Sequence, residues 1–168
     1  MLQNERFSDN MGGGFIQILV DADACPVKDI IIRNAKKQGI PVTMITDTSH
    51  ELSDGYSTVV TVDKERDSVD IKLINLLKRG DIVVTQDYGV AAMGLGKGAK
   101  VINQNGLIFS DDNIDRLLFE RHIGQKVRRA GGRTGSIKKR TKENDEAFER
   151  ALLRLLEEAH VDKVNGEK

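Results

Sequence analysis

The sequence predicts one three-layer α/β domain whose sheet is mostly parallel, and three observations support this prediction. Short, nearly continuous apolar runs recur along the chain, as expected of strands buried on both faces. Segments with helical spacing separate the runs, which favours right-handed crossovers and helices on both faces of the sheet. The chain has 168 residues, about one domain's worth, without an internal repeat or a second core.

About five strands are expected from the apolar runs. The second run begins after Pro41, and the third follows a long polar stretch at residues 47–57. The fourth and fifth each follow a helical segment that ends at a glycine, Gly80 or Gly98. The predicted strands are residues 15–20, 42–46, 58–62, 82–85 and 100–102.

Helices are expected between and after these strands. Pro26 suits the first turn of one helix, and Gly39 suits its C-terminal cap. Apolar residues at helical spacing predict a second helix at residues 67–79. The same reasoning predicts a short helix at about 88–97 and C-terminal helices at about 111–129 and 145–159, which pack onto the domain.

The chain ends differ in composition from the domain between them. Residues 1–14 are polar and end in three glycines, which predicts a disordered leader. We also expect a disordered tail at residues 161–168, so that the single domain covers 15–160. No apolar run approaches the roughly 18 residues needed to cross a bilayer. The lone Cys25 fits a reducing compartment, and we expect a cytoplasmic protein without a membrane partner.

The charges balance overall but not locally. With 26 basic and 26 acidic residues, the net charge of +0 argues against binding nucleic acid or membranes through the overall field. Between residues 126 and 142, however, the chain carries eight basic residues and no acid. This basic segment is rich in glycine, and it is expected to form a loop between the last two helices. The sequence sets no oligomeric state.

Aspartates close the apolar runs. Asp21, Asp47 and Asp63 follow three of them directly, and Asp87 follows the fourth after a Thr-Gln pair. The carboxyl ends of parallel strands lie at one edge of a sheet, where open α/β sheets bind ligands. Clustered carboxylates repel each other unless a cation neutralises them. The pattern therefore predicts a site for a divalent metal, Mg²⁺ or Mn²⁺.

Three motifs supply the candidate ligands, and each has a purely structural alternative. Asp21 and Asp23 could both reach a metal, or Asp23 could cap the following helix. Asp67 and Asp70 resemble a capping box at a helix start, yet they also offer carboxylates beside the strand ends. Asp87 repeats the geometry of Asp21, or it caps the next helix. Asp47 and Asp63 are weaker candidates because they lie beside the long polar loop.

The basic segment is a candidate contact for phosphates. Its glycines would let backbone amides turn toward an anion, and its arginines and threonine would bond to phosphate oxygens. A solvated flexible loop is the alternative, because charge runs often have no other role. The candidate residues are Arg128, Arg129, Arg133, Thr134, Lys138, Lys139 and Arg140.

Four motifs resemble those of the YaiI/YqxD family of uncharacterised bacterial proteins. They are Val20-Asp21-Ala22-Asp23-Ala24-Cys25-Pro26, Asp67-Ser68-Val69-Asp70, Asp81-Ile82-Val83-Val84-Thr85-Gln86-Asp87-Tyr88-Gly89-Val90-Ala91 and Arg129-Ala130-Gly131-Gly132-Arg133-Thr134-Gly135. The resemblance implies a PIN-like domain, a Rossmann-like sheet whose acids are similar to those of metal-dependent nucleases. It places Asp21, Asp70 and Asp87 at the positions of the acids in that fold. The early-helix glutamate of many PIN nucleases has no counterpart here.

Three functions remain open on this basis. The leading hypothesis is a Mg²⁺- or Mn²⁺-dependent phosphodiesterase, a nuclease acting on RNA or single-stranded nucleic acid, with Asp21, Asp70 and Asp87 as catalytic acids. A phosphatase similar to haloacid dehalogenases would use Asp21 as nucleophile and Asp23 as acid/base. A non-catalytic module that binds nucleic acid or nucleotides would keep the same fold.

Overall fold

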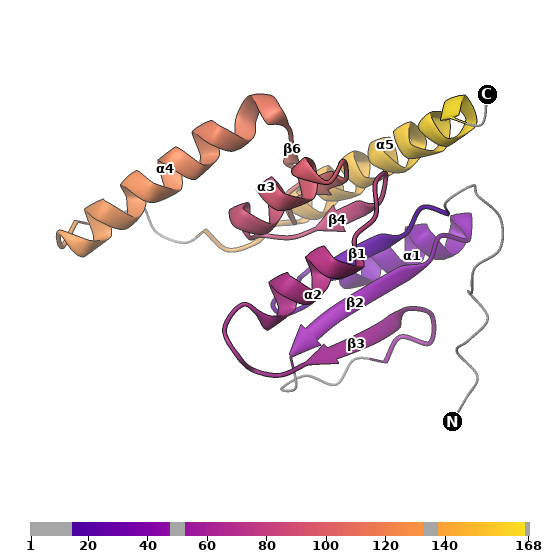
Figure 1. Ribbon diagram of the computed structural model, residues 1–168, viewed down its shortest axis with the longest axis horizontal. Coiled ribbons are helices and arrows are strands. Elements are labelled where there is room, and N and C mark those ends of the chain that lie inside the picture. The colour runs from indigo at the N-terminus through magenta and orange to yellow at the C-terminus, as the bar shows by residue number, and fades with distance from the viewer. Residues whose placement is uncertain (1–14, 48–52, 133–137, 167–168) are drawn as a thin grey trace.

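The computed structural model describes residues 15–47, 53–132 and 138–166, and it confirms the three-layer α/β fold (Figure 1). Within this part of the chain, six strands form one sheet in the order β3-β2-β1-β4-β5-β6, and every pairing except β5 with β6 is parallel. The leader predicted at residues 1–14 lies outside the described residues. The strands are β1 (Ile18–Asp21), β2 (Val42–Asp47), β3 (Thr58–Val62), β4 (Ile82–Val84), β5 (Lys100–Ile102) and β6 (Ile108–Phe109).

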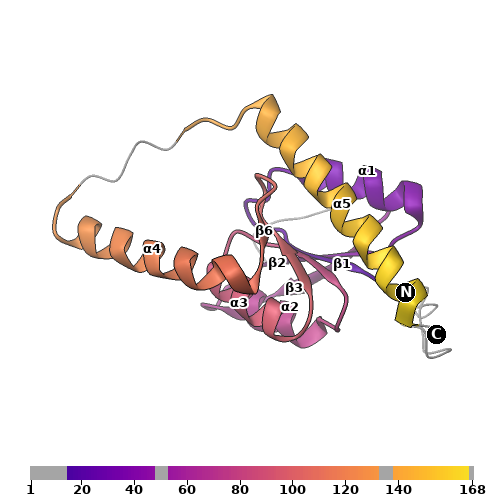
Figure 2. The same ribbon diagram turned by 90° about the horizontal axis from the view of Figure 1, so that it is seen from above.

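Helices cover both faces of the sheet because the strands are apolar on both sides (Figure 2). Ile18 and Val20 of β1 point into a core that α1 and α5 cover, whereas Leu19 points into a second core under the other three helices. The helices are α1 (Lys28–Gln38), α2 (Ser68–Leu76), α3 (Tyr88–Gly96), α4 (Asp111–Arg129) and α5 (Lys142–Gly166).

The sixth strand, β6, was not predicted, because two residues are too few to show a period. A tight turn creates it: the side-chain oxygen of Asn103 accepts hydrogen bonds from the backbone N–H groups of Asn105 (2.9 Å) and Leu107 (3.0 Å). Gly106 is required in this turn. Its φ is +87°, and a Cβ there would lie 2.6 Å from the carbonyl oxygen of Ala147 in α5.

Two helix starts and one helix end differ from the prediction. Pro26 lies in a turn before α1, although Gly39 does cap that helix in the left-handed conformation. α2 is shorter than expected: Leu77 is already extended, so the chain leaves the helix before Gly80. α5 begins earlier, where Thr141 and the side chain of Asn144 bond to each other's backbone N–H groups.

The prediction of a disordered tail is wrong for residues 161–166, which continue α5. Two contacts support these last turns. Lys100 of β5 forms an ion pair of 2.9 Å with Asp162, and the Lys163 ammonium lies 4.7 Å from the ring centre of Phe15. Residues 167–168 lie outside the described residues. No helix in the described part of the chain is long and apolar enough to cross a membrane.

Candidate functional site

The strand order creates a switch point between β1 and β4. The chain runs outward from β1 through β2 to β3 on one side, and from β4 through β5 to β6 on the other. The connection after β1 leads to α1 on one face, and that after β4 leads to α3 on the opposite face. The two connections diverge, and such a divergence is where open α/β sheets bind ligands. Asp21 ends β1 and Asp87 follows β4, so both predicted acids lie here.

Asp21 is the most perturbed acid of this edge. Its carboxylate is partly buried and accepts a hydrogen bond of 3.3 Å from the Thr85 hydroxyl. Burial, together with the negative charges of Asp70, Asp23 and Asp87, raises the pKa of Asp21 from 3.8 to about 6, and the bond from Thr85 opposes the rise. A carboxyl group with this pKa holds its proton almost into the neutral range.

Asp70 joins the two strand-end acids from the first turn of α2. Burial raises its pKa, and the nearby charges of Asp87 and Asp67 add to the rise. Three elements that are far apart in sequence, β1, α2 and the start of α3, therefore bring Asp21, Asp70 and Asp87 into one electrostatic field. The three acids that the sequence and the resemblance single out therefore lie close enough in the structure for the charge of Asp87 to act on both Asp21 and Asp70.

Asp87 caps α3, as its structural alternative predicted. Its Oδ1 accepts the backbone N–H of Val90 at 3.0 Å, and its own N–H donates to the Thr85 hydroxyl at 3.1 Å. Gly89 leaves room for this carboxylate, since a Cβ there would lie 3.0 Å from Oδ1. The capping bond uses one of the two oxygens, so the role is compatible with metal binding through the other.

Asp23 does not cap α1, which shows that this alternative was wrong. Instead its two oxygens accept the Thr46 hydroxyl (2.6 Å) and the Asp47 backbone N–H (3.1 Å). These bonds fasten the loop after β1 to the end of β2. The first of them also explains how Thr46 is buried as a polar residue. Asp47 thus belongs to the support of the loop, one strand away from the switch point, and Asp63 lies farther out, after β3.

Asp67 does not form the predicted capping box either. It precedes α2 with a φ of +65°, and its side chain makes no capping hydrogen bond. Ala24, in the loop after β1, has a φ of +58°. Among the described residues these two are the ones with positive φ that are not glycine, and both border the acids. Such strained backbone conformations are concentrated at functional sites.

The acids do not form a ready-made metal cage. In the described residues, no three Asp, Glu, His or Cys side chains are grouped closely enough to hold an ion. Carboxylates repel each other when no cation lies between them, so these side chains are expected to stay apart in the absence of an ion. Binding an ion would have to draw Asp21, Asp70 and Asp87 together.

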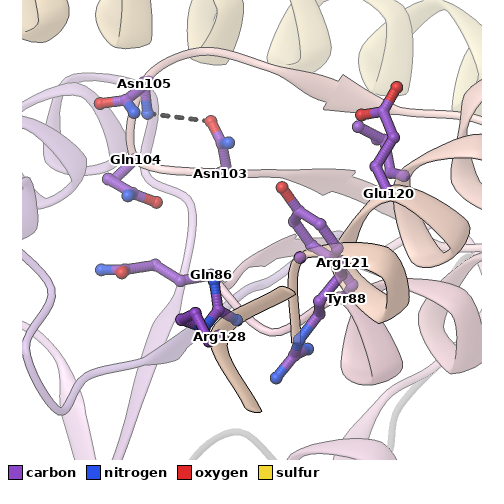
Figure 3. Close-up of a pocket in the computed structure, with 10 residues that line it drawn as sticks. Gln86, Tyr88, Asn103, Gln104, Asn105, Glu120, Arg121 and Arg128 are labelled. Carbon is purple, nitrogen blue, oxygen red and sulfur yellow. Dashed lines mark hydrogen bonds between the residues drawn. The ribbon is translucent and has the colours of Figure 1, made fainter. Parts of the chain in front are cut away.

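A polar cavity of about 500 Å³ has in its wall Gln86 and Tyr88, the two neighbours of Asp87 in the chain (Figure 3). It opens between the ends of β4 and β5 and one side of α4. Gln86 belongs to its wall and donates a hydrogen bond of 3.1 Å to the carbonyl of Ala24, which connects the cavity to the loop of Asp21 and Asp23. The buried Oε1 of Gln104 has no partner in the described structure. The lining residues are Gln86, Tyr88, Asn103, Gln104, Asn105, Leu117, Glu120, Arg121, Gly124 and Arg128.

Sequence reasoning missed most of this cavity. The polar run Asn103-Gln104-Asn105 follows an apolar strand just as the aspartates do, and that position was the available signal. Arg121 gave no signal, because it lies outside the basic segment. Its guanidinium is 5.8 Å from the centre of the Tyr88 ring.

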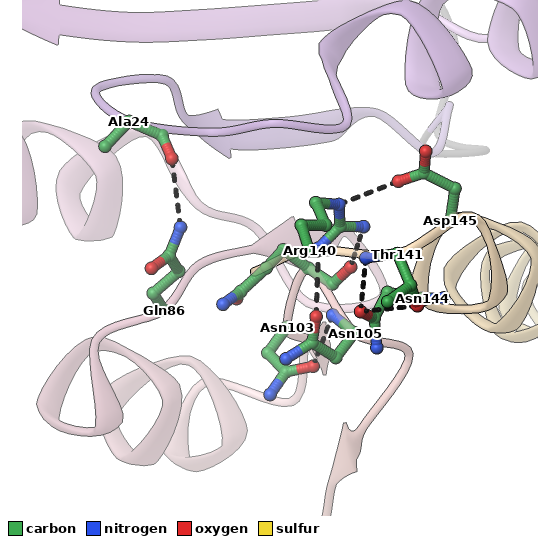
Figure 4. A network of polar contacts seen from close by, with 9 residues as sticks. Ala24, Gln86, Asn103, Asn105, Arg140, Thr141, Asn144 and Asp145 are labelled. Atoms are coloured by element: carbon green, nitrogen blue, oxygen red, sulfur yellow. Dashed lines mark hydrogen bonds and ion pairs between the residues drawn. The ribbon is translucent and has the colours of Figure 1, made fainter. Parts of the chain in front are cut away.

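The basic segment divides into different roles. Arg128 lines the cavity, while Arg129, Lys138 and Lys139 are exposed. Arg140 forms what we call an internal clamp, because its guanidinium donates hydrogen bonds within the protein. The acceptors are the side chains of Asp145 (2.7 Å) and Asn105 (2.9 Å), which Figure 4 shows, and the carbonyl of Gln104 (2.7 Å). This clamp fixes the start of α5 to the β5–β6 turn. Arg133 and Thr134 lie outside the described residues.

Two glycines of this segment, Gly131 and Gly132, end α4 instead of facing an anion. Gly131 has a φ of +80°, and its N–H bonds to the carbonyl of Arg128 at 3.1 Å. The N–H of Gly132 bonds to the carbonyl of Val127 at 2.9 Å. This pair of bonds is a Schellman motif, so these amides are already used.

Comparison with known proteins gives one family and no solved structure. Residues 19–158 match the family described as "Uncharacterized BCR, YaiI/YqxD family". The chain is 85% identical over 138 residues to a UPF0178 protein of Ruminiclostridium cellulolyticum, which covers 82% of this chain and 90% of that protein. It is 54% identical over 151 residues to a UPF0178 protein of Alkaliphilus oremlandii, covering 90% and 97%. No solved structure matches significantly.

Proposed function

The chain belongs to the YaiI/YqxD family, and for this member we propose a divalent-metal-dependent phosphodiesterase that cleaves RNA or other single-stranded nucleic acid. One observation carries the proposal: Asp21, Asp70 and Asp87 share an electrostatic field at the switch point of the sheet. Partly buried carboxylates that repel each other lower the stability of the folded protein, and a bound ion such as Mg²⁺ or Mn²⁺ would offset this loss. The resemblance to the YaiI/YqxD family implies a PIN-like domain, and acids at these three positions would be the metal ligands of such a domain.

Each residue of the site has a part in this proposal. Asp21, Asp70 and Asp87 would hold the ion, and Thr85, whose hydroxyl donates to Asp21, would orient that carboxylate. Asp23 positions the loop by its bonds to β2. When bound, the ion supplies activation of water and charge stabilisation at the phosphodiester. Asp67, which directly precedes α2, is a weaker candidate for a metal ligand.

The cavity beside the acids supports a nucleic-acid substrate. Arg121 and Arg128 line it and would bond to phosphate oxygens, while its amides would bond to bases or sugars. The exposed Arg129, Lys138 and Lys139 would extend the phosphate contacts. Arg140 has no part in this surface because its donors bind within the protein. A cytoplasmic location belongs to the same proposal.

The phosphatase hypothesis finds less support. It needs Asp23 as a mobile acid/base, whereas both oxygens of Asp23 accept bonds from β2. The non-catalytic binding module remains as an outcome of the experiment below.

The proposal is tested by incubating purified protein with labelled single-stranded RNA and Mn²⁺. We expect cleavage that a chelator stops and that Asp21→Asn abolishes. Asp81→Asn, at the amino end of β4, is the control at the other end of the strands and should cleave as the wild type does. RNA bound without Mn²⁺ and left intact would identify a binding module. Cleavage that survives Asp21→Asn would show that the assignment is wrong.

A further inference from the structure

Side-chain amides are concentrated in the wall of the polar cavity (Figure 3). An amide offers a donor and an acceptor side by side, whereas a phosphate offers acceptors alone. The edge of a nucleobase also combines donors with acceptors. A wall of amides therefore matches a base better than it matches a phosphate. The amides belong to Gln86, Asn103, Gln104 and Asn105.

Bonds within the protein fix which atoms of three of these amides are available to a ligand. The oxygen of Asn103 accepts two backbone N–H groups (2.9 and 3.0 Å), which leaves its NH₂ group as a donor. The oxygen of Asn105 accepts from Arg140 at 2.9 Å, which leaves a second donor. Gln86 donates to the carbonyl of Ala24 at 3.1 Å and keeps its oxygen as an acceptor. Among the described residues, these remaining amide atoms have no hydrogen-bond partner.

Gln104 is the amide whose buried acceptor the fold does not satisfy. Its Oε1 is buried, and no donor of the described residues bonds to it. Every other buried side-chain nitrogen or oxygen in the described part of the chain has a partner. A buried acceptor without a donor lowers the stability of the folded protein, and native structures keep few of them. A ligand that supplies an N–H group would remove this cost.

A buried acceptor in the wall discriminates between bases. The amino group of adenine or cytosine projects beyond the ring and donates, and the ring nitrogen beside it accepts. Gln104 would accept from the amino group, and the NH₂ group of Asn103 or Asn105 would donate to the ring nitrogen. The N3–H of uracil lies between two carbonyl oxygens, which repel another oxygen. The wall therefore favours a base that carries an amino group.

The rest of the wall offers a stacking surface and positive charge. In the view of Figure 3, Tyr88 and Arg121 lie to the other side of the cavity from the amides. The Arg121 guanidinium is 5.8 Å from the centre of the Tyr88 ring, and both kinds of group stack on bases. Glu120 pairs with Arg116 at 3.0 Å, whereas Arg121 and Arg128 have no acidic partner among the described residues. These two arginines remain for a phosphate.

We propose that the cavity is a base-reading subsite for one nucleotide whose base is adenine or cytosine, with Gln104 as the residue that recognises the amino group. The inference rests on the proposed function, since it makes this nucleotide part of the strand to be cleaved. The volume of about 500 Å³ lies within the range of about 300–1,000 Å³ of sites that enclose small ligands. Gln86 and Tyr88 flank Asp87, so the nucleotide would lie beside an acid of the metal site.

Binding of single nucleotides in the presence of a chelator tests the subsite apart from cleavage. In calorimetry, AMP and CMP should bind at least about tenfold more tightly than UMP or ribose 5-phosphate, which has no base. Gln104→Ala should weaken AMP binding about tenfold, the value of one hydrogen bond, and leave ribose 5-phosphate binding unchanged. Gln38→Ala, the same change at the exposed end of α1, is the matched control. UMP that binds as tightly as AMP, or no effect of Gln104→Ala, would overturn the proposal.

Removing the amino group from the ligand checks what Gln104 contacts. Purine riboside 5′-monophosphate is AMP without that group. It should bind the wild type about as weakly as AMP binds Gln104→Ala, and Gln104→Ala should not weaken it further. Circular dichroism on each variant checks that the domain is folded. An equal loss of affinity for both ligands in Gln104→Ala would mean that Gln104 only supports the wall.

The subsite and the phosphodiesterase can fail separately. RNA that is cleaved in Mn²⁺ while AMP and CMP bind no better than ribose 5-phosphate would overturn the subsite alone. Selective binding of AMP and CMP with intact RNA would overturn the phosphodiesterase alone and leave a nucleotide-binding site. If both hold, cuts should fall beside adenine and cytosine, and Gln104→Ala should remove this preference without stopping cleavage.

Discussion

The two ends of the β1–β4 pair carry aspartates in opposite circumstances. At the amino end, Asp81 precedes β4, is 2% exposed and accepts three hydrogen bonds, from the backbone N–H groups of Lys78 (2.9 Å) and Gln17 (3.4 Å) and from the Gln17 amide (3.0 Å). At the carboxyl end, Asp21 accepts one bond of 3.3 Å and faces the charges of Asp70, Asp23 and Asp87.

This comparison separates a structural acid from a functional one. Burial raises the pKa of both Asp81 and Asp21, but at Asp81 hydrogen bonds from the fold oppose the rise. Asp81 fastens the start of β1 to the start of β4. Asp21 is left under-compensated among like charges, and such a residue costs stability unless a ligand uses it. The consequences differ in activity, in stability and in pH dependence.

The largest difference is expected in activity. Asp70→Asn and Asp87→Asn should each lower the rate of RNA cleavage in Mn²⁺ by at least about 100-fold. Changing a residue that only supports a metal ligand already costs up to about 100-fold, and losing a ligand itself should cost at least as much. Asparagine at 87 keeps an oxygen that caps α3, so the loss would not reflect unfolding. Asp81→Asn should cleave within about threefold of the wild type. Equal losses in all three variants would remove the distinction between the two ends.

The next difference is expected in stability and has opposite signs. Asp81→Ala leaves a buried backbone N–H without its acceptor and should lower the free energy of unfolding by about 1–3 kcal/mol. Asp21→Asn removes an under-compensated charge and should raise it by about 1–2 kcal/mol at pH 7.5 without metal, allowing for the partial exposure of this site. Urea unfolding measures both. A destabilised Asp21→Asn would mean that Asp21 is a structural residue too.

The smallest difference concerns pH. The pKa of Asp21 is about 6 in the folded protein and near 3.8 in the unfolded chain, so the folded state binds the extra proton between these values. The wild type should therefore lose stability as the pH rises from about 4 to about 6, relative to Asp21→Asn. Below pH 4 the two proteins should differ little, and above pH 6 the gap should be constant. Urea titrations at several pH values check this. A gap that widens as the pH falls would contradict the raised pKa.

Added Mn²⁺ should reverse this trend in the wild type. Ion binding requires ionised carboxylates and stabilises only the folded state, so the gain in melting temperature should appear above about pH 6 and fade below it. Asp21→Asn should show little gain at any pH. A gain of equal size in both proteins would place the ion elsewhere.

The fold was largely predictable because the strands are apolar on both faces and the helices end at recognisable residues. β3 and β5 have the predicted bounds, and Gly39 caps α1 as expected. β6 was not predictable, since it depends on the turn at Asn103 and on the approach of α5 to Gly106. The final turns of α5 depend on contacts with Lys100 and Phe15, which are distant in sequence.

The site was predictable only as a set of candidates. Strand-end position identified Asp21 and Asp87, but the strand order that makes them neighbours is a tertiary property. The capping roles predicted for Asp23 and Asp67 were wrong. A carboxylate near a helix start can bond elsewhere, as Asp23 does to Thr46, or make no capping bond, as at Asp67. The sequence predicted that Arg140 contacts phosphates. In the structure it donates to three groups of the protein that are distant or set by tertiary packing, and the sequence gives no sign of these partners.

A crystal structure with Mn²⁺ tests the central claim most directly. We predict anomalous density among the carboxylates of Asp21, Asp70 and Asp87, with these side chains drawn toward the ion and Asp87 still accepting the N–H of Val90 through one oxygen. Asp81 should remain bound to Lys78 and Gln17. A structure at saturating Mn²⁺ with no density between the three acids, and with their side chains still apart, would contradict the account.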